Sequence, residues 1–183
     1  FAREEAMALG LSAYSALTLK VMLDRGPVAS IRGIDGAWDG IRHEVAGRSL
    51  TLNAIEHEIL RKLYPDARLH MVLVCAARSC PKLYAGAFTP SNLEGRLDAA
   101  SSGFATDAQR NVWAPDSGEL KVSRIFEWYG SDFVGQYASR GGGDDATAGI
   151  RGFFATYLDD PAVGQSTVKV SYLDYDWSLN GSW

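Results

Sequence analysis

The order of apolar and polar residues along the chain predicts a series of helices and short strands. A mostly apolar run over residues 3–24, closed by Gly26 and Pro27, predicts a long first helix. Residues 41–50 predict a short hairpin with Gly47 in its turn. The chain is therefore expected to begin with a helix followed by a hairpin.

A second helix is expected from Asn53 to about residue 63, because Asn53 and Glu56 have the spacing of a capping box. At about 100° per residue, four apolar residues share one stripe that is expected to face the core. They are Leu52, Ile55, Ile59 and Leu63. Glu56 lies at the edge of this stripe, whereas His57 points nearly opposite, on one face with Asn53 and Arg61. His57 is then either an exposed histidine or a residue that faces a cleft formed by another segment.

Residues 69–76, "LHMVLVCA", are apolar on both faces apart from His70. This pattern is typical of a central strand that is covered on both sides. Side chains alternate along a strand, so Leu69, Met71, Leu73 and Cys75 would share one face. The strand would end in the loop that carries Cys80.

The second half of the chain is expected to alternate irregularly between helices and strands. The expected order is a helix at 92–104, a hairpin of strands 111–115 and 119–123, helices at 124–133 and 145–158, and a strand at 167–173. Residues 139–145, "SRGGGDD", are expected to form a flexible linker. Because no regular βαβ alternation is present, we expect one α+β domain over residues 1–183. Its helices would pack around a small sheet with the strand at 69–76 in the centre.

Composition excludes some classes of function. The chain has 183 residues, 46% of them hydrophobic, which allows a sizeable core without disulfides. The net charge of −4 argues against nucleic acid as the main partner. The longest apolar stretch contains Ser12, Ser15, Thr18 and Lys20, so it predicts a buried helix rather than a membrane span. Phe1 is not an initiator methionine, so we expect an N-terminally trimmed chain, which allows for a removed export signal.

The only cysteines, Cys75 and Cys80, lie close together in the sequence. Arg78 is near enough to raise the thiolate fraction of Cys80, and Pro81 keeps Cys80 out of a helical conformation. Three interpretations stay open. The pair forms a local disulfide if the Cα atoms approach within about 7 Å; one cysteine is a nucleophile activated by a histidine such as His57; or a thiolate and a histidine bind a metal. The metal is the weakest interpretation, because the spacing is wider than CxxC and histidines are few, and no metal or cofactor is expected.

Several stretches carry a resemblance to a known protein family. The most specific are the Ile-Glu-His triplet at residues 55–57 and the Cys-xxxx-Cys-Pro element at residues 75–81. Others are "EEAMALGLSAYSALTL", "FTPSNLEGRLDAA", "VSRIFEWYGSDF" and the terminal "YLDYDWSLN". On these residues the chain resembles, almost end to end, the family called Domain of Unknown Function 547. Members of that family occur as exported bacterial proteins and as the C-terminal part of plant proteins.

The resemblance implies a functional role for Glu56 and His57 and a periplasmic or secreted location. It implies no reaction, because the activity of the family is not established. Plant relatives work in reducing compartments, so the resemblance argues against an obligatory disulfide. The first helix departs from the family pattern: Gly10, Ser12 and Ser15 replace a tryptophan and two asparagines, so a site served by those amides would be weakened or altered.

Our leading hypothesis from the sequence is an exported, thiol-centred hydrolase or acyl transferase that acts on a small molecule or peptide. The expected catalytic residues are Cys80 or Cys75 as nucleophile, His57 as base and acid, and Glu56 as its orienter. The residues expected to bind the substrate are Arg78, Ser79, Tyr14 and Arg61, and either Arg78 or the N–H groups of residues 76–80 would stabilise an oxyanion. The first alternative is a non-catalytic binding domain, which the departures in the first helix favour. The second is a thiol–disulfide redox element.

Overall fold

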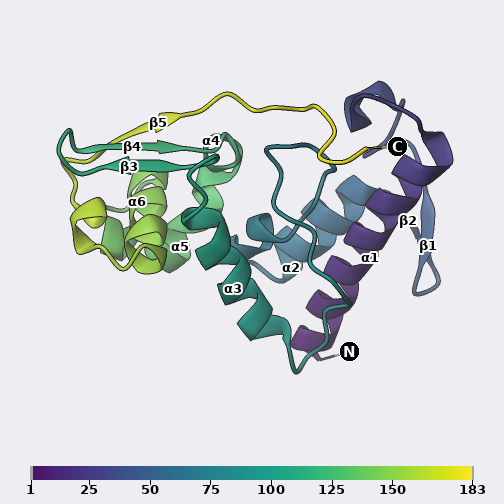
Figure 1. Cartoon of the computed structure of the whole chain (residues 1–183). Helices are drawn as coiled ribbons and strands as arrows, with labels where there is room; N and C mark the ends of the chain where they lie inside the picture. The colour runs from purple at the N-terminus through teal and green to yellow at the C-terminus, as the bar shows by residue number, and fades with distance from the viewer. Residues whose placement is uncertain (1, 183) are drawn as a thin grey trace. The chain divides into compact units, whose positions relative to one another are not determined.

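The computed structural model describes residues 2–182 and has the α+β fold that the sequence predicts (Figure 1). The chain forms two compact units, and each is assembled from separate stretches of sequence. Unit 1 holds the described residues up to Pro65, Leu69–Leu97 and those from Asp176 onward. Unit 2 holds Asp66–Arg68 and Asp98–Tyr175. The expectation that residues 1–183 act as one domain stays a prediction.

Helix α1 (Arg3–Arg25) confirms the predicted first helix of unit 1. It ends at Gly26, whose backbone N–H donates to the carbonyl of Met22 over 2.8 Å. By length and composition α1 would suit a membrane span, but buried core helices pass the same test. Met7, Leu11 and Tyr14 are buried and lie three or four residues apart, so this face of α1 belongs to the core of unit 1.

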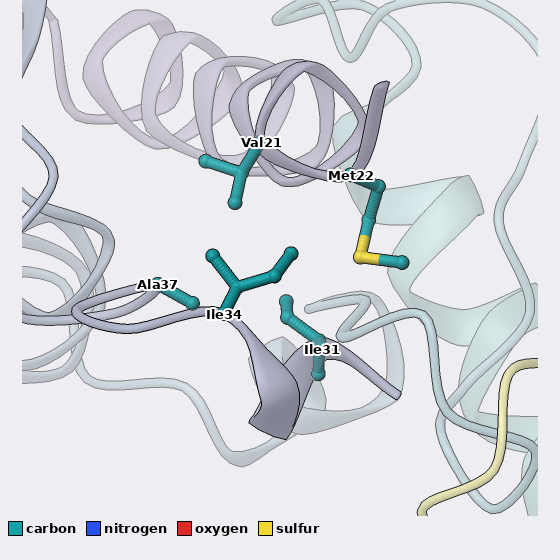
Figure 2. Packing of buried hydrophobic residues seen from close by; sticks show 5 residues of the cluster. All are labelled: Val21, Met22, Ile31, Ile34 and Ala37. Carbon is teal, nitrogen blue, oxygen red and sulfur yellow. The ribbon is translucent and has the colours of Figure 1, made fainter. Parts of the chain in front are cut away.

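One part of that core lies where α1 ends (Figure 2). Val21 and Met22 of α1 pack against Ile31, Ile34 and Ala37 from the short 3-10 helix η1 (Ile31–Gly33) and the residues that follow it. All five side chains are buried. This cluster fixes the return of the chain after α1 and leads it into the hairpin.

Strands β1 (His43–Val45) and β2 (Arg48–Leu50) form the predicted hairpin. Its two turn residues, Ala46 and Gly47, have φ angles of 49° and 75°. Two consecutive positive φ angles are typical of the tight turn whose twist matches that of antiparallel strands, and glycine adopts such an angle without a steric cost. The turn therefore sets the register that pairs His43 with Leu50.

The predicted central strand at 69–76 is wrong. Residues Ala67–Met71 form the 3-10 helix η3, and the chain then continues to residue 76 outside any strand. The Asp66 carboxylate accepts a hydrogen bond from the backbone N–H of Arg68 over 2.9 Å, which favours a helical turn at this point. Leu69–Val74 are all buried, so the apolar run correctly indicated burial. A short apolar run does not by itself distinguish a buried strand from a buried helical turn.

Besides the β1-β2 hairpin of unit 1, a three-stranded sheet lies in unit 2 and has the strand order β3-β4-β5. Strand β3 (Val112–Ala114) runs antiparallel to β4 (Glu119–Val122), and β5 (Lys169–Tyr172) runs parallel to β4. These strands confirm the predicted hairpin and the predicted last strand. The helical elements from here on are α3 (Leu93–Ala105), α4 (Ile125–Tyr129), η4 (Gly130–Phe133), α5 (Val134–Tyr137), η5 (Ala138–Gly141), α6 (Ala146–Tyr157) and η6 (Pro161–Gly164).

The core of unit 2 is aromatic, and the backbones around it pack closely. Phe126 lies at its centre, with its ring centroid 5.0 Å from those of Phe133 and Phe154. A Cβ atom added to Gly152 of α6 would overlap the carbonyl oxygen of Tyr137, and one added to Gly149 would lie 2.8 Å from the carbonyl carbon of Phe133. Helix α6 can thus approach the preceding helices only because glycines stand at these contacts.

The glycine-rich segment expected to be a linker is part of this packing. Its first residues belong to η5, and a Cβ atom at Gly141 would overlap the carbonyl oxygen of Ala148 in α6. Asp145 caps α6 by accepting a hydrogen bond from the N–H of Ala148 over 2.7 Å. The flexibility expected for residues 139–145 stays a prediction.

The close approach of α6 predicts a large difference between two glycine substitutions. Gly152→Ala forces a methyl group against backbone, and we expect it to lower the free energy of unfolding by about 1–3 kcal/mol or more. Gly95→Ala in α3 meets no atom within 4 Å and is expected to raise it by about 0.5–1 kcal/mol, because alanine is the better helix former. Urea denaturation followed by circular dichroism measures both. Equal effects of the two variants would contradict the packing described here.

The buried side chain of His43 in β1 is expected to make the stability of the protein depend on pH. The side chain is buried, and within residues 2–182 its Nε2 atom has no hydrogen-bond partner. Loss of hydration lowers the pKa of His43 below 6.5 and nearby Lys20 lowers it further, while Asp24 acts in the opposite direction. The unfolded chain therefore binds the proton more readily, so stability rises with pH.

We expect the free energy of unfolding to fall on acidification from about pH 7.5 to about pH 5, as His43 is forced to take up a proton on unfolding. His43→Gln removes this proton uptake and is expected to give a flatter dependence on pH. Urea midpoints measured across this range for both proteins test the prediction. Parallel curves would show that His43 does not contribute.

Candidate functional site

The Ile-Glu-His triplet lies in a π-helical segment, η2 (Ala54–Leu60), which continues into the short helix α2 (Arg61–Leu63). In a π-helix the backbone N–H donates to the carbonyl five residues earlier, as Arg61 does to Glu56. The turn is wider than in an α-helix, so residues four or five apart share a face. Such segments are rare in proteins, and those that occur are often found at functional sites.

The wider turn changes which side chains face the core. Ile55, Glu56 and Leu60 are buried, whereas Leu63 is 57% exposed. The predicted stripe is therefore wrong at its C-terminal end, because it assumed α-helical spacing throughout. Glu56, expected at the edge, is only 6% exposed, and His57 is half-buried.

The helix also begins earlier than predicted. Thr51 accepts a hydrogen bond at its hydroxyl from the N–H of Ala54 over 3.1 Å. Asn53 already has helical backbone angles and makes no capping bond with its side chain. The predicted capping box of Asn53 and Glu56 is therefore wrong, because the hydroxyl of Thr51 caps the first turn.

Arg61 determines which ring nitrogen of His57 accepts a hydrogen bond in this structure. Its Nη1 atom lies 2.9 Å from Nδ1 of His57, and a guanidinium group can only donate. Nδ1 therefore accepts, and the neutral ring carries its proton on Nε2. The Glu56 carboxylate lies 3.8 Å from the same Nδ1, too far for a hydrogen bond. Nδ1 of the imidazole is thus contacted by Arg61, which was expected to bind substrate, and the role of Glu56 as its orienter stays a prediction.

His57 lines a pocket of about 670 Å³ that η2 forms with the hairpin and with the segment before it. The charged and amide side chains in its wall are Asp39, Arg42, Arg48, Asn53, His57 and Glu58. His57 and Asn53 therefore face a shared pocket, as one interpretation of the helix face expected. Arg42 and Arg48 were not predicted as site residues, because the hairpin pattern indicates only an element of the fold.

The two arginines of the pocket differ in how firmly they are held. Arg42 donates from Nε to the hydroxyl of Ser49 over 3.1 Å and from Nη2 to the Ser49 carbonyl over 2.7 Å. These bonds tie its guanidinium to the hairpin. Arg48 is exposed, and its side chain has no polar partner among residues 2–182. One cation of the pocket is thus fixed, and the other is available to a ligand.

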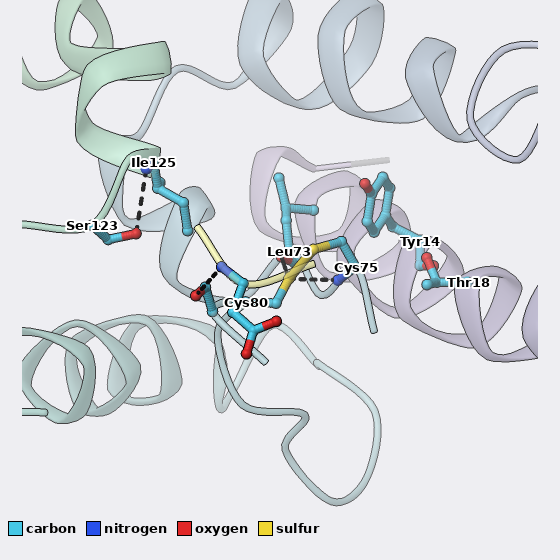
Figure 3. Close-up of a disulfide and its surroundings, with 9 residues drawn as sticks. Tyr14, Thr18, Leu73, Cys75, Cys80, Ser123 and Ile125 are labelled. Atoms are coloured by element: carbon cyan, nitrogen blue, oxygen red, sulfur yellow. Dashed lines mark hydrogen bonds between the residues drawn. A yellow bond between two sulfur atoms is a disulfide. The ribbon is translucent and has the colours of Figure 1, made fainter. Parts of the chain in front are cut away.

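Cys75 and Cys80 form a disulfide, with their Cα atoms 5.9 Å apart (Figure 3). Of the three interpretations of the pair, the structure contains the first. Cys80 is 2% exposed, whereas Cys75 is half-buried. Neither cysteine belongs to the wall of the His57 pocket. A role as nucleophile requires a reduced thiol and stays a prediction.

The loop between the cysteines is bound to the C-terminal tail. The N–H of Arg78 donates to the carbonyl of Ser178 over 2.9 Å, and that of Ser79 donates to the carbonyl of Asp176 over 3.2 Å. The hydroxyl of Ser79 accepts from the N–H of Asp176 over 2.9 Å. In this conformation two of the N–H groups expected to stabilise an oxyanion, those of Arg78 and Ser79, donate to the tail, and that of Cys80 donates to the carbonyl of Ala77.

Tyr14, the remaining predicted binding residue, is buried in α1, and Figure 3 shows it on the side of Cys75. The unusual residues nearby have structural roles. A Cβ atom at Gly10 would lie 2.8 Å from Cδ2 of Leu60, so the missing side chain lets α1 approach η2. Ser12 accepts a hydrogen bond from the N–H of Phe88 over 2.9 Å. Among residues 2–182, no group of three or more His, Cys, Asp or Glu side chains is placed to hold a metal ion.

The N-terminal part of the chain, which contains the residues of this pocket and the disulfide, matches a known protein family. The sequence model of the family described as "Protein of unknown function, DUF547" matches residues 1–105, which is more than half of the chain. The chain therefore belongs to the DUF547 family, as the resemblance indicated. Comparisons with curated proteins and with solved structures found no match. The C-terminal tail lies outside the matched residues.

The position of the helix cap can be tested by mutation. We expect Thr51→Ala to lower the free energy of unfolding by about 1 kcal/mol, because it leaves the N–H of Ala54 without its partner. Thr51→Ser keeps the hydroxyl and should retain most of the stability, and Asn53→Ala should change it by less than about 0.5 kcal/mol. Thermal and urea unfolding measure all three. A larger loss in Asn53→Ala than in Thr51→Ala would restore the capping box predicted from the sequence.

Proposed function

We propose that this protein is a non-catalytic binding domain whose His57 pocket takes a small zwitterionic molecule, such as an amino acid or a short peptide. The observation that carries the proposal is the hydrogen bond from Arg61 to Nδ1 of His57. It leaves the proton on Nε2, so that nitrogen is a hydrogen-bond donor rather than a base. A donor at Nε2 suits a ligand that presents a hydrogen-bond acceptor to His57.

The charges in the pocket support a ligand with both signs of charge. Arg42 and Arg48 can bind a carboxylate, and planar guanidinium groups suit it because they can donate two parallel hydrogen bonds. Asp39 and Glu58 line the same pocket and can bind an ammonium group. A volume of about 670 Å³ lies within the usual range for small-molecule sites. Since the wall is mostly polar, an apolar ligand is disfavoured.

The thiol-centred hydrolase has less support than the binding domain. It needs a reduced cysteine within reach of His57, and in this structure both cysteines are joined to each other. It also needs His57 as a base, but Nδ1 is occupied by Arg61. We further propose a periplasmic or secreted location, which the Cys75–Cys80 disulfide supports, because disulfides persist in oxidising compartments.

The proposal is tested by titrating the protein with the twenty amino acids and a set of dipeptides, using calorimetry. We expect at least one of them to bind, and acetate and methylamine alone to bind much more weakly. Arg48→Ala is expected to lower the affinity about 10- to 100-fold, because a hydrogen bond to a charged group contributes about 1.5–3 kcal/mol. Arg3→Ala removes the same charge from an exposed position of α1 and serves as the control.

Binding that survives Arg48→Ala unchanged would place the ligand elsewhere. If no amino acid or dipeptide binds to the oxidised protein, the proposal fails.

A further inference from the structure

The two cysteine residues of the disulfide lie in different surroundings. Cys80 is 2% exposed, and its sulfur also accepts a hydrogen bond from the N–H of Cys75 over 2.7 Å. Cys75 is half-buried and is the more accessible of the two residues. Exchange between thiols and disulfides depends on which sulfur an attacking thiolate can reach. This asymmetry points to one direction of attack.

We infer that the Cys75–Cys80 disulfide is a site of thiol–disulfide exchange, at which an external thiol attacks Cys75 and Cys80 leaves. The inference is independent of the pocket proposed above. It rests on the burial of Cys80, on the N–H of Cys75 directed at the sulfur of Cys80, and on the attachment of the tail to the loop between the cysteines.

In the first step a thiolate of the reductant forms a bond to Sγ of Cys75. The bond between Cys75 and Cys80 breaks, and its electron pair goes to Sγ of Cys80. The N–H of Cys75 already points at that sulfur and stabilises the thiolate that forms. In the second step another thiolate of the reductant attacks its own sulfur in the mixed disulfide, and Cys75 leaves. The protein gains two electrons and two protons, and the dithiol reductant becomes a disulfide.

The tail provides a structural response to this reaction. Besides the bonds at Arg78 and Ser79, the N–H of Asn180 donates to the carbonyl of Ala76 over 3.0 Å, and Ala77 pairs with Leu179 in an isolated β-bridge. Ala76 has a φ angle of 60°, which a residue other than glycine adopts rarely. The loop closed by the disulfide keeps Ala76 in this conformation. The carbonyl of Ala76 therefore stays in position to accept the hydrogen bond from Asn180. Opening of the loop removes that constraint and releases residues 176–180.

The direction of attack is tested with two single variants and glutathione disulfide. Cys80→Ser leaves Cys75 as the only thiol, and Cys75→Ser leaves Cys80. We expect Cys75 in the first variant to be glutathionylated at least about tenfold faster than Cys80 in the second, because access limits the exchange. Mass spectrometry of the digested proteins gives both rates. Equal rates, or a faster reaction at Cys80, would overturn the inference.

A measurement on the native protein keeps the test decisive if a variant does not fold. The folded protein is treated with a dithiol, quenched with iodoacetamide at intervals and mapped by mass spectrometry. We expect reduction without unfolding, followed by faster amide hydrogen exchange in residues 176–180, with α6 unchanged as the internal control. A disulfide that is reduced only after denaturation, or a tail whose exchange does not change on reduction, would show that the bridge is a purely structural staple.

Discussion

The backbone hydrogen bonds of residues 54–60 decide how the most specific motif of the family is presented. Because these bonds span five residues, Ile55, Glu56 and Leu60 turn inward together while His57 faces the hairpin. With α-helical spacing Ile59 and Leu63 would take the inner positions, and the triplet would face differently. The pocket, the contact with Arg61 and the burial of a carboxylate all depend on this one widened turn.

The disulfide loop depends on a different constraint, which is the satisfaction of backbone groups. Residues 76–80 lie outside any helix or strand, so the regular hydrogen bonds of such elements do not satisfy their N–H and carbonyl groups. These groups need other partners. The C-terminal tail supplies them from about one hundred residues further along the chain, through Asp176, Ser178 and Asn180. Groups that could serve chemistry in an isolated loop are here used to bind the tail.

Two of the three residues at which α1 departs from the expected family pattern, Gly10 and Ser12, have structural roles within unit 1. Gly10 leaves space that Leu60 occupies, which brings α1 close to η2. Ser12 holds the backbone of Phe88 through its hydroxyl. Neither residue lines the His57 pocket, so these two positions affect the packing of α1 and not the pocket wall. Membership of the family and an altered binding preference are therefore compatible.

The sequence by itself determined the elements that local signals define. Gly26 ends α1, Gly47 adopts the positive φ angle of the hairpin turn and Asp145 caps α6; each effect acts within a few residues. It also indicated that residues 69–74 are buried, but it left open whether His57 is exposed or faces a cleft. Tertiary structure alone decided that the run at 69–76 is not a strand, that Arg42 and Arg48 join His57, and that the tail binds the disulfide loop. Those outcomes depend on partners distant in sequence, which periodicity and local propensity do not encode.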